Sequence, residues 1–259
     1  MKIVVLVKHV PDATGNRGFS ADSTADRAGV DGLLSELDEY AVEQALRVVE
    51  KAGEGEVTYL TMGPEAAGAA LRKALSMGGD AAVHVVDDAL HGSDAIATSL
   101  VLAKALGKLE YDLVITGMAS TDGTMSVVPV MVAERLGLPS ATYASDLAIA
   151  DGVVTIRRDG DAASETIEVK LPALVSVTDQ TGEARYPSFK GIMAAKKKPV
   201  TTYSIADLDI PAEQVGLGAA WSVVESVTKR PARTAGVKVV DDGEGAAKLT
   251  EFLVTQKFI

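Results

Sequence analysis

The feature that most constrains the fold is a regular alternation of short apolar runs with longer amphipathic segments through the first half of the chain. The apolar runs are continuous, as expected of strands buried on both faces, and most amphipathic segments end at a glycine. This pattern predicts strands at residues 3–7, 57–61, 82–86 and 113–116, and helices at residues 36–51, 65–77, 94–106 and 127–136. Such an order predicts a doubly wound, mostly parallel α/β sheet with right-handed crossovers and helices on both faces.

The pattern changes after residue 139. Short segments at 153–158, 164–170 and 173–178, separated by turns, predict antiparallel additions to the sheet. A lysine-rich stretch at 196–204 is typical of a boundary. We therefore expect one α/β domain at residues 1–198 and a C-terminal arm at residues 199–259, with a last helix near 245–254. The arm has too little periodicity to form a strong core of its own.

Charge and composition exclude several classes of function. The net charge of -11 argues against a nucleic-acid partner, and the absence of cysteine excludes disulfides, thiolate catalysis and cysteine-ligated metals. Three scattered histidines give no metal-ligand spacing, so we expect no metal. No apolar run is long enough for a membrane span, and the first residues fit a strand better than a signal peptide. We expect a cytoplasmic protein if the source is bacterial.

The stretch "ITGMASTDGTMSVVP" (residues 115–129) leads from a buried strand to a helix start. Gly117 and Gly123 permit unusual backbone conformations, and Asp122 favours a turn. Proline is tolerated only in the first helical turn, so we expect Ser126 to be the N-cap, with Pro129 at the third helical position. The free N–H groups of the helix start would then favour an anion. The spacing alone leaves open a polar connection that binds nothing.

Two further serines are candidate helix caps. Ser35 precedes the first predicted helix, with Asp38 three residues later as an approximate capping box, and Ser93 precedes the third.

Several other stretches carry a family resemblance. In chain order they are "LVKHVPD", "ELDEYAVEQALRVVE", "TMGPEAA", "RKALSMGGDAAVHV", "KLPALVSV", "RYPSFKGIMAAKKKP" and "RPARTAGVKV". Together they resemble the beta subunit of electron transfer flavoprotein over nearly the whole chain, and "IMAAKKKP" and "RTAG" are the most specific parts. The resemblance implies the adenine-nucleotide-binding (HUP-like) variant of the doubly wound sheet. It also implies an alpha-subunit partner, an FAD shared with alpha, and AMP held by the beta subunit. We expect the C-terminal arm at residues 199–259 to wrap the alpha subunit.

The resemblance also places the nucleotide contacts. It assigns AMP binding to Leu6, Ser35, Glu36, Leu37, Asp38, Met62, Gly117, Met118, Ala119, Ser120, Thr121, Asp122, Gly123, Thr124, Met125, Ser126, Val127 and Val128. The family often has Asn at the position of Ser35 and more polar side chains in the loop. Arg158 and Asp159 match positions that the family brings toward the flavin, where Arg-Glu is the usual pair; an ordinary surface charge pair is the alternative.

The segment at residues 185–194, here called the docking segment, resembles the loop by which the family docks on partner dehydrogenases. Its residues are Arg185, Tyr186, Pro187, Ser188, Phe189, Lys190, Gly191, Ile192, Met193 and Ala194. Phe189 would be the apolar anchor, because an exposed aromatic side chain is costly unless a partner covers it. The alternative is a Phe189 buried in the protein's own core. Lys196–198 would be a solvated charge run or would steer acidic partners.

The resemblance implies an electron carrier rather than an enzyme. Electrons would pass from acyl-CoA and related dehydrogenases through the shared FAD to a membrane quinone oxidoreductase. Two alternatives stay open: a bifurcating relative with a second FAD in the AMP site, and a stand-alone ATP- or AMP-binding protein of similar fold.

Overall fold

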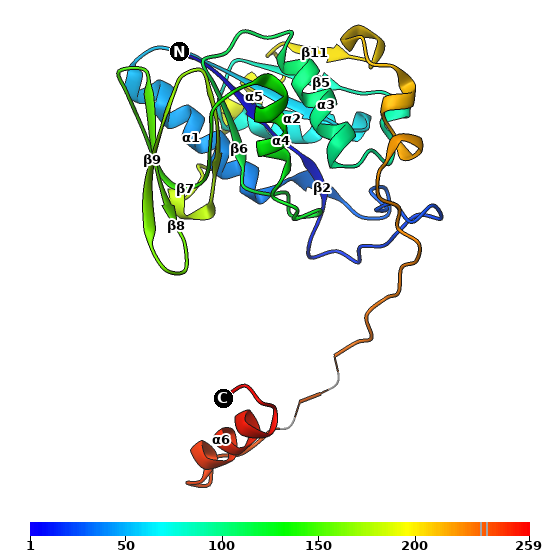
Figure 1. Cartoon of the computed structure of the whole chain (residues 1–259), viewed down its shortest axis with the longest axis vertical. Coiled ribbons are helices and arrows are strands. Elements are labelled where there is room, and N and C mark those ends of the chain that lie inside the picture. Colours follow the sequence, from blue (N-terminus) through cyan, green and yellow to red (C-terminus); the bar gives the residue numbers. More distant parts are fainter. Residues whose placement is uncertain (234, 237) are drawn as a thin grey trace. The chain divides into compact units, whose positions relative to one another are not determined.

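A nine-stranded sheet in the order β11-β5-β4-β1-β6-β10-β7-β8-β9 forms the centre of the protein in the computed structural model (Figure 1). The structure describes residues 1–233, 235–236 and 238–259. The strands are β1 (Lys2–Leu6), β4 (Glu56–Met62), β5 (Ala81–Val85), β6 (Leu113–Gly117), β7 (Ser140–Ala150), β8 (Val153–Asp159), β9 (Ser164–Lys170), β10 (Ala173–Val177) and β11 (Val200–Tyr203). A separate hairpin joins β2 (His9–Pro11) to β3 (Gly32–Leu34).

Helices cover both faces of this sheet. They are α1 (Glu36–Ala52), α2 (Gly68–Met77), α3 (Ala95–Leu106), α4 (Val128–Leu136) and α5 (Phe189–Ala195). Short 3-10 helices are η1 (Glu65–Ala67), η2 (Asp88–Leu90), η3 (Asp179–Thr181), η4 (Ala206–Leu208), η5 (Ala212–Gln214) and η6 (Leu217–Ala219). Buried residues of α1 and α2 belong to one hydrophobic cluster, and those of α3 and α4 to the other. The predicted doubly wound, mostly parallel α/β fold is therefore confirmed.

The antiparallel addition is smaller than expected. β8 and β9 are antiparallel, as predicted, but β10 runs parallel between β6 and β7, so that prediction is wrong for residues 173–178. All five residues of β10 are buried, as is typical of a strand inside a parallel sheet. β7 was missed. Many of its side chains are small or polar, and only two of its eleven residues are fully buried, so the segment has no continuous apolar run.

The compact unit also extends further than expected. The chain divides into Met1–Glu225 and Ser226–Ile259, not after residue 198. β11 pairs in parallel with β5, and Ile205, Leu208, Ile210 and Val215 are buried in the α3 and α4 cluster. Residues 199–215 are thus part of the main core, and the lysine-rich stretch is not a boundary.

The helix starts correct three sequence expectations. Ser35 occupies the N-cap position of α1, but its side chain makes no capping hydrogen bond. Asp94, rather than Ser93, caps α3, and Ser93 Oγ accepts instead from the N–H of Gly216. Val127, rather than Ser126, is the N-cap of α4, which puts Pro129 at the second helical position.

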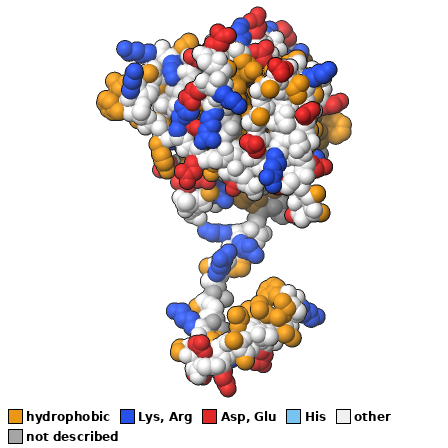
Figure 2. All heavy atoms as spheres, turned by 90° about the vertical axis from the view of Figure 1, so that its left-hand side faces the viewer, with side chains coloured by type: hydrophobic (Ala, Val, Ile, Leu, Met, Phe, Trp, Pro, Cys, Tyr) orange, Lys and Arg blue, Asp and Glu red, His pale blue; other side chains and the backbone are white. Residues whose placement is uncertain are grey.

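The second unit contains α6 (Gly245–Thr255). Hydrophobic side chains gather on this helix and the residues after it, among them Leu249, Phe252, Val254, Phe258 and Ile259, which are all exposed (Figure 2). The "RTAG" stretch belongs to the same part of the chain, and its Thr234, like Val237, lies outside the described residues.

Candidate functional site

The sheet order reverses beside β1. β1 pairs with β4 on one side and with β6 on the other, and both pairings are parallel. The carboxyl ends of these three strands therefore meet at one edge, where open α/β sheets bind their ligands. Leu6, Met62 and Gly117 lie at these three ends. The structure thus brings together strand-end residues that the sequence expectation had placed in one site.

Gly117 lies directly against the start of α1. A Cβ atom added to Gly117 would be 2.6 Å from Asp38 Oδ1 and 2.8 Å from the carbonyl oxygen of Leu37. A side chain at this position would collide with the start of α1. Glycine is therefore required here by close approach rather than by an unusual turn.

The buried carboxyl of Asp38 joins α1 to the end of β1. Its Oδ2 accepts a hydrogen bond from the backbone N–H of Lys8 at 2.8 Å. Burial raises the pKa of Asp38 to about 7, despite the opposing effect of the Lys8 and Gly117 N–H groups. The expected capping box is therefore wrong, because Asp38 contacts another strand end. Ser35 also contacts the loop, since its Oγ accepts from the N–H of Thr121 at 3.3 Å.

Two basic side chains converge on Asp122 in the loop after β6. Asp122 Oδ1 lies 2.8 Å from Lys8 Nζ, and Asp122 Oδ2 lies 2.7 Å from a guanidinium nitrogen of Arg27. Burial opposes ionisation of this carboxyl, but Lys8 and hydrogen bonds from Ser120 and Arg27 hold its pKa well below the usual range. Arg27 also donates to the carbonyl oxygen of His9 at 3.2 Å.

Lys8 and Arg27 were missed as site residues. The position of Lys8, just beyond the end of the first predicted strand, was a usable signal. No sequence signal marked Arg27. It lies within the long connection between β2 and β3 and reaches Asp122 in the loop after β6 only through tertiary folding.

The loop reaches the start of α4 through two strained residues. Thr124 and Ser126 have φ values of 51° and 58°, whereas Gly123 does not have a positive φ. The expectation that Gly123 supplies the special backbone conformation is therefore wrong. The first intrahelical bond runs from Met131 to Val127, so the N–H groups of Val128 and Val130 have no acceptor within the helix. Together with Lys8 and Arg27, they make this edge suitable for a phosphate.

The nearby apolar side chains of the same edge are exposed. Met125, Val127 and Val130 are each at least 40% exposed. They lie beside the N–H donors of the α4 start, so this edge offers an apolar contact surface as well as polar groups.

Arg158 and Asp159 form pairs within the antiparallel extension. Arg158 lies 2.8 Å from Glu165 on β9, and Asp159 accepts hydrogen bonds from Arg157 at 2.9 Å and from Ser145 at 2.6 Å. Both residues are thus paired on the surface with other residues of the extension, and not with each other.

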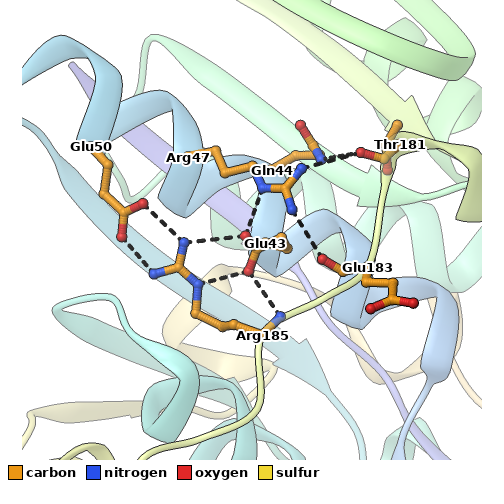
Figure 3. Close-up of polar contacts among 7 residues, drawn as sticks. All are labelled: Glu43, Gln44, Arg47, Glu50, Thr181, Glu183 and Arg185. Atoms are coloured by element: carbon orange, nitrogen blue, oxygen red, sulfur yellow. Dashed lines mark hydrogen bonds and ion pairs between the residues drawn. The ribbon is translucent and has the colours of Figure 1, made fainter.

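The docking segment presents apolar side chains to solvent. Tyr186 is 93% exposed and Phe189 is 80% exposed, with Ile192 and Met193 about half exposed. Phe189 is therefore not part of the protein's own core. Arg185 differs, because its guanidinium points back to α1 (Figure 3).

Lys198 also has a partner. Its Nζ donates to the carbonyl oxygens of Leu75 at 2.8 Å and Gly78 at 3.0 Å. It therefore binds the carboxyl end of α2 and is not part of a solvated charge run.

Within the described ranges, the His, Asp and Glu side chains form no cluster of three suited to a metal ion. The helices in the same part of the chain are too short or too polar to cross a membrane.

Comparison with known proteins shows which family the chain resembles. Residues 22–208 match the family described as "Electron transfer flavoprotein domain". The electron transfer flavoprotein subunit beta of Mycobacterium bovis is 49% identical over 263 residues, covering 99% of each chain. The subunit of the same name from Mycobacterium leprae is 48% identical over 99% of each chain. That from Thermoanaerobacterium thermosaccharolyticum is 36% identical over all of both chains.

Proposed function

This chain belongs to the electron transfer flavoprotein family as a beta subunit, and we propose from that premise that it binds AMP at the Gly117 loop and shares an FAD with an alpha subunit. A beta subunit of this kind is an electron carrier rather than a catalytic enzyme. Its residues bind and orient nucleotides, and the FAD, when bound, supplies the redox chemistry.

The meeting of β1, β4, β6 and α1 at one edge carries the AMP proposal. Lys8, Arg27 and the N–H groups of α4 offer positive charge and donors to a phosphate. Asp122 already neutralises part of this charge, so the backbone donors are the main contribution to binding. The loop Gly117–Val128 would close over the phosphate, and Ser35–Asp38, Leu6 and Met62 would line the nucleoside side. AMP at this site stabilises the folded chain by mass action.

We further propose a cytoplasmic heterodimer, because the relatives named above are bacterial. It would accept electrons from acyl-CoA and related dehydrogenases and deliver them to a membrane quinone oxidoreductase. Arg158 and Asp159 would lie near the flavin after exchanging their present partners. The test is reduction of the purified heterodimer by an acyl-CoA dehydrogenase and octanoyl-CoA, followed by flavin absorbance. A flavin that the dehydrogenase does not reduce would refute this direction of transfer.

The exposed docking segment carries the proposal for dehydrogenase binding. An aromatic anchor that is 80% exposed becomes favourable when a partner pocket covers it. Phe189→Ala should raise the KM for the heterodimer as electron acceptor about tenfold, with flavin content unchanged. Phe19→Ala is the matched control, because Phe19 is also exposed but lies in another loop. Equal KM values for the two variants would refute the assignment.

A further inference from the structure

The buried carboxylate of Glu43 binds Arg185, the first residue of the docking segment. The Glu43 side chain is only 4% exposed and lies on the middle of α1. Arg185 donates to it from its backbone N–H at 3.1 Å, from Nε at 2.7 Å and from a terminal nitrogen at 3.2 Å. Arg47, one turn along the helix, donates to the same carboxylate at 2.7 Å (Figure 3).

Further contacts tie the same stretch to α1. Arg185 reaches Glu50 with both terminal nitrogens, at 2.5 and 2.9 Å. Gln44 donates to the carbonyl oxygen of Thr181 at 2.9 Å, and Arg47 to that of Glu183 at 3.1 Å. The chain is therefore fixed to α1 over the residues that lead directly into the exposed Tyr186 and Phe189.

The other side of the docking segment is fixed to α2. A Cβ atom on Gly191 would lie 2.3 Å from the carbonyl oxygen of Ser76, so α5 lies directly against α2. Lys198 holds the carboxyl end of the same helix. Between these anchors Ser188 caps α5, with its Oγ accepting from the N–H of Gly191 at 3.0 Å.

The planar, forked guanidinium of Arg185 can fix the orientation of the docking segment as well as its position. A planar guanidinium that bonds two carboxylates allows one orientation, whereas a lysine ammonium would tolerate several. Burial would raise the pKa of Glu43, but the hydrogen bonds from Arg185 and Arg47 lower it below its usual value. The carboxylate thus stays charged and retains its partners. Fixing a surface before it binds lowers the entropy lost on association.

We propose that Glu43 and Arg185 are positioning residues that hold the docking segment in its binding-competent conformation. This inference rests on the docking role proposed above for Phe189. Arg185 is accordingly a residue that acts through Tyr186 and Phe189, and its own side chain faces α1 rather than a partner.

The test uses the heterodimer with alpha and two readouts. Hydrogen exchange of the 186–195 backbone reports local order, and KM and kcat with an acyl-CoA dehydrogenase report docking. Arg185→Lys keeps the charge but loses the fork; Glu50→Gln removes only the exposed partner and preserves folding. Glu110→Gln is the matched control, because Glu110 forms an exposed ion pair with Lys2 elsewhere on the surface.

We expect Arg185→Lys to accelerate exchange of these amides about tenfold and to raise KM about fivefold, with kcat and flavin content unchanged. Glu50→Gln should show smaller changes in the same direction, and Glu110→Gln none. In the Phe189→Ala background, Arg185→Lys should add little to KM, because its effect passes through that anchor.

Two outcomes would overturn the proposal. Unchanged exchange in Arg185→Lys would show that the contacts to Glu43 do not order the segment. Faster exchange with unchanged KM, while Phe189→Ala alone raises KM, would show that this order is irrelevant to docking. If neither variant changes KM, the docking role itself is refuted, and the positioning role falls with it.

Discussion

At the scale of single residues, the candidate site depends on the approach of α1 to the end of β6. Gly117→Ala would place a methyl group 2.6 Å from Asp38 Oδ1. Separating α1 from the sheet to relieve this contact should lower the free energy of unfolding by about 1–3 kcal/mol. AMP content should fall with it. Urea unfolding and nucleotide analysis measure the two effects.

Gly123→Ala is the control, because a Cβ atom there meets nothing closer than 3.5 Å. An equal loss in both variants would contradict the close-approach argument. The sequence singled out both Gly117 and Gly123, but it did not show which of them is required by close packing. A strand end followed by glycine is visible in a pattern, whereas the distance from Gly117 to α1 is a tertiary fact. The contacts of Arg27 were hidden for the same reason.

Asp38 supplies a prediction about pH. Its pKa is about 7 in the folded chain, against an ordinary value of 3.8 that applies to the unfolded chain. The folded state thus keeps a proton that the unfolded state has lost between these values, so this residue's contribution to stability falls as pH rises from 4 to 7. Asp38→Asn has no proton to lose. Relative to the wild type, the variant should gain up to about 4 kcal/mol of unfolding free energy between pH 4 and pH 8.

Urea unfolding of both proteins at the two pH values measures this difference. The comparison with wild type cancels the opposite contribution of Asp122, whose depressed pKa lends stability that is lost on acidification. A pH-independent difference between Asp38→Asn and wild type would mean that Asp38 is already ionised at low pH.

At the scale of elements, α2 depends on a lysine that lies far from it in sequence. Lys198→Ala removes the donor for the carbonyl oxygens of Leu75 and Gly78. The variant should lose about 1 kcal/mol of unfolding free energy. Lys197→Ala, at an exposed neighbouring position, should lose much less. Equal thermal melting temperatures for both variants would show that the Lys198 contacts are not stabilising.

Elements could be predicted where the pattern of apolar residues within each element shows which of its faces are buried. The strands β1, β4, β5 and β6 and the helices between them were found because continuous apolar runs and glycine stops are local signals. β10 has the same continuous apolar character, "ALVSV", but lies among short strands, and its neighbours suggested an antiparallel arrangement. Strand partners depend on contacts distant in sequence, so the direction of β10 could not be derived from its own residues.

At the scale of the whole molecule, the chain contains one core and a separate unit with exposed apolar side chains. The buried hydrophobic residues of both clusters lie within Met1–Glu225. A chain ending at Glu225 should therefore fold, with melting within about 3 °C of the full chain. It should no longer copurify with the alpha subunit, because α6 would be missing as a contact surface.

Circular dichroism and co-expression with tagged alpha test both parts. A stable heterodimer formed by the truncated chain would contradict the proposal that residues 226–259 wrap the alpha subunit. The same proposal came from the sequence with an earlier boundary. The low periodicity of the last residues was visible there, but the pairing of β11 with β5 was not.

We propose above all that this beta subunit holds AMP at the β1/β6 edge while sharing FAD with alpha. The most direct measurement is nucleotide content: the heterodimer is purified, denatured, and its FAD and AMP are quantified by chromatography. We expect one FAD and one AMP per heterodimer. Two FAD and no AMP would contradict it and assign the Gly117 loop to a second flavin, as in a bifurcating relative.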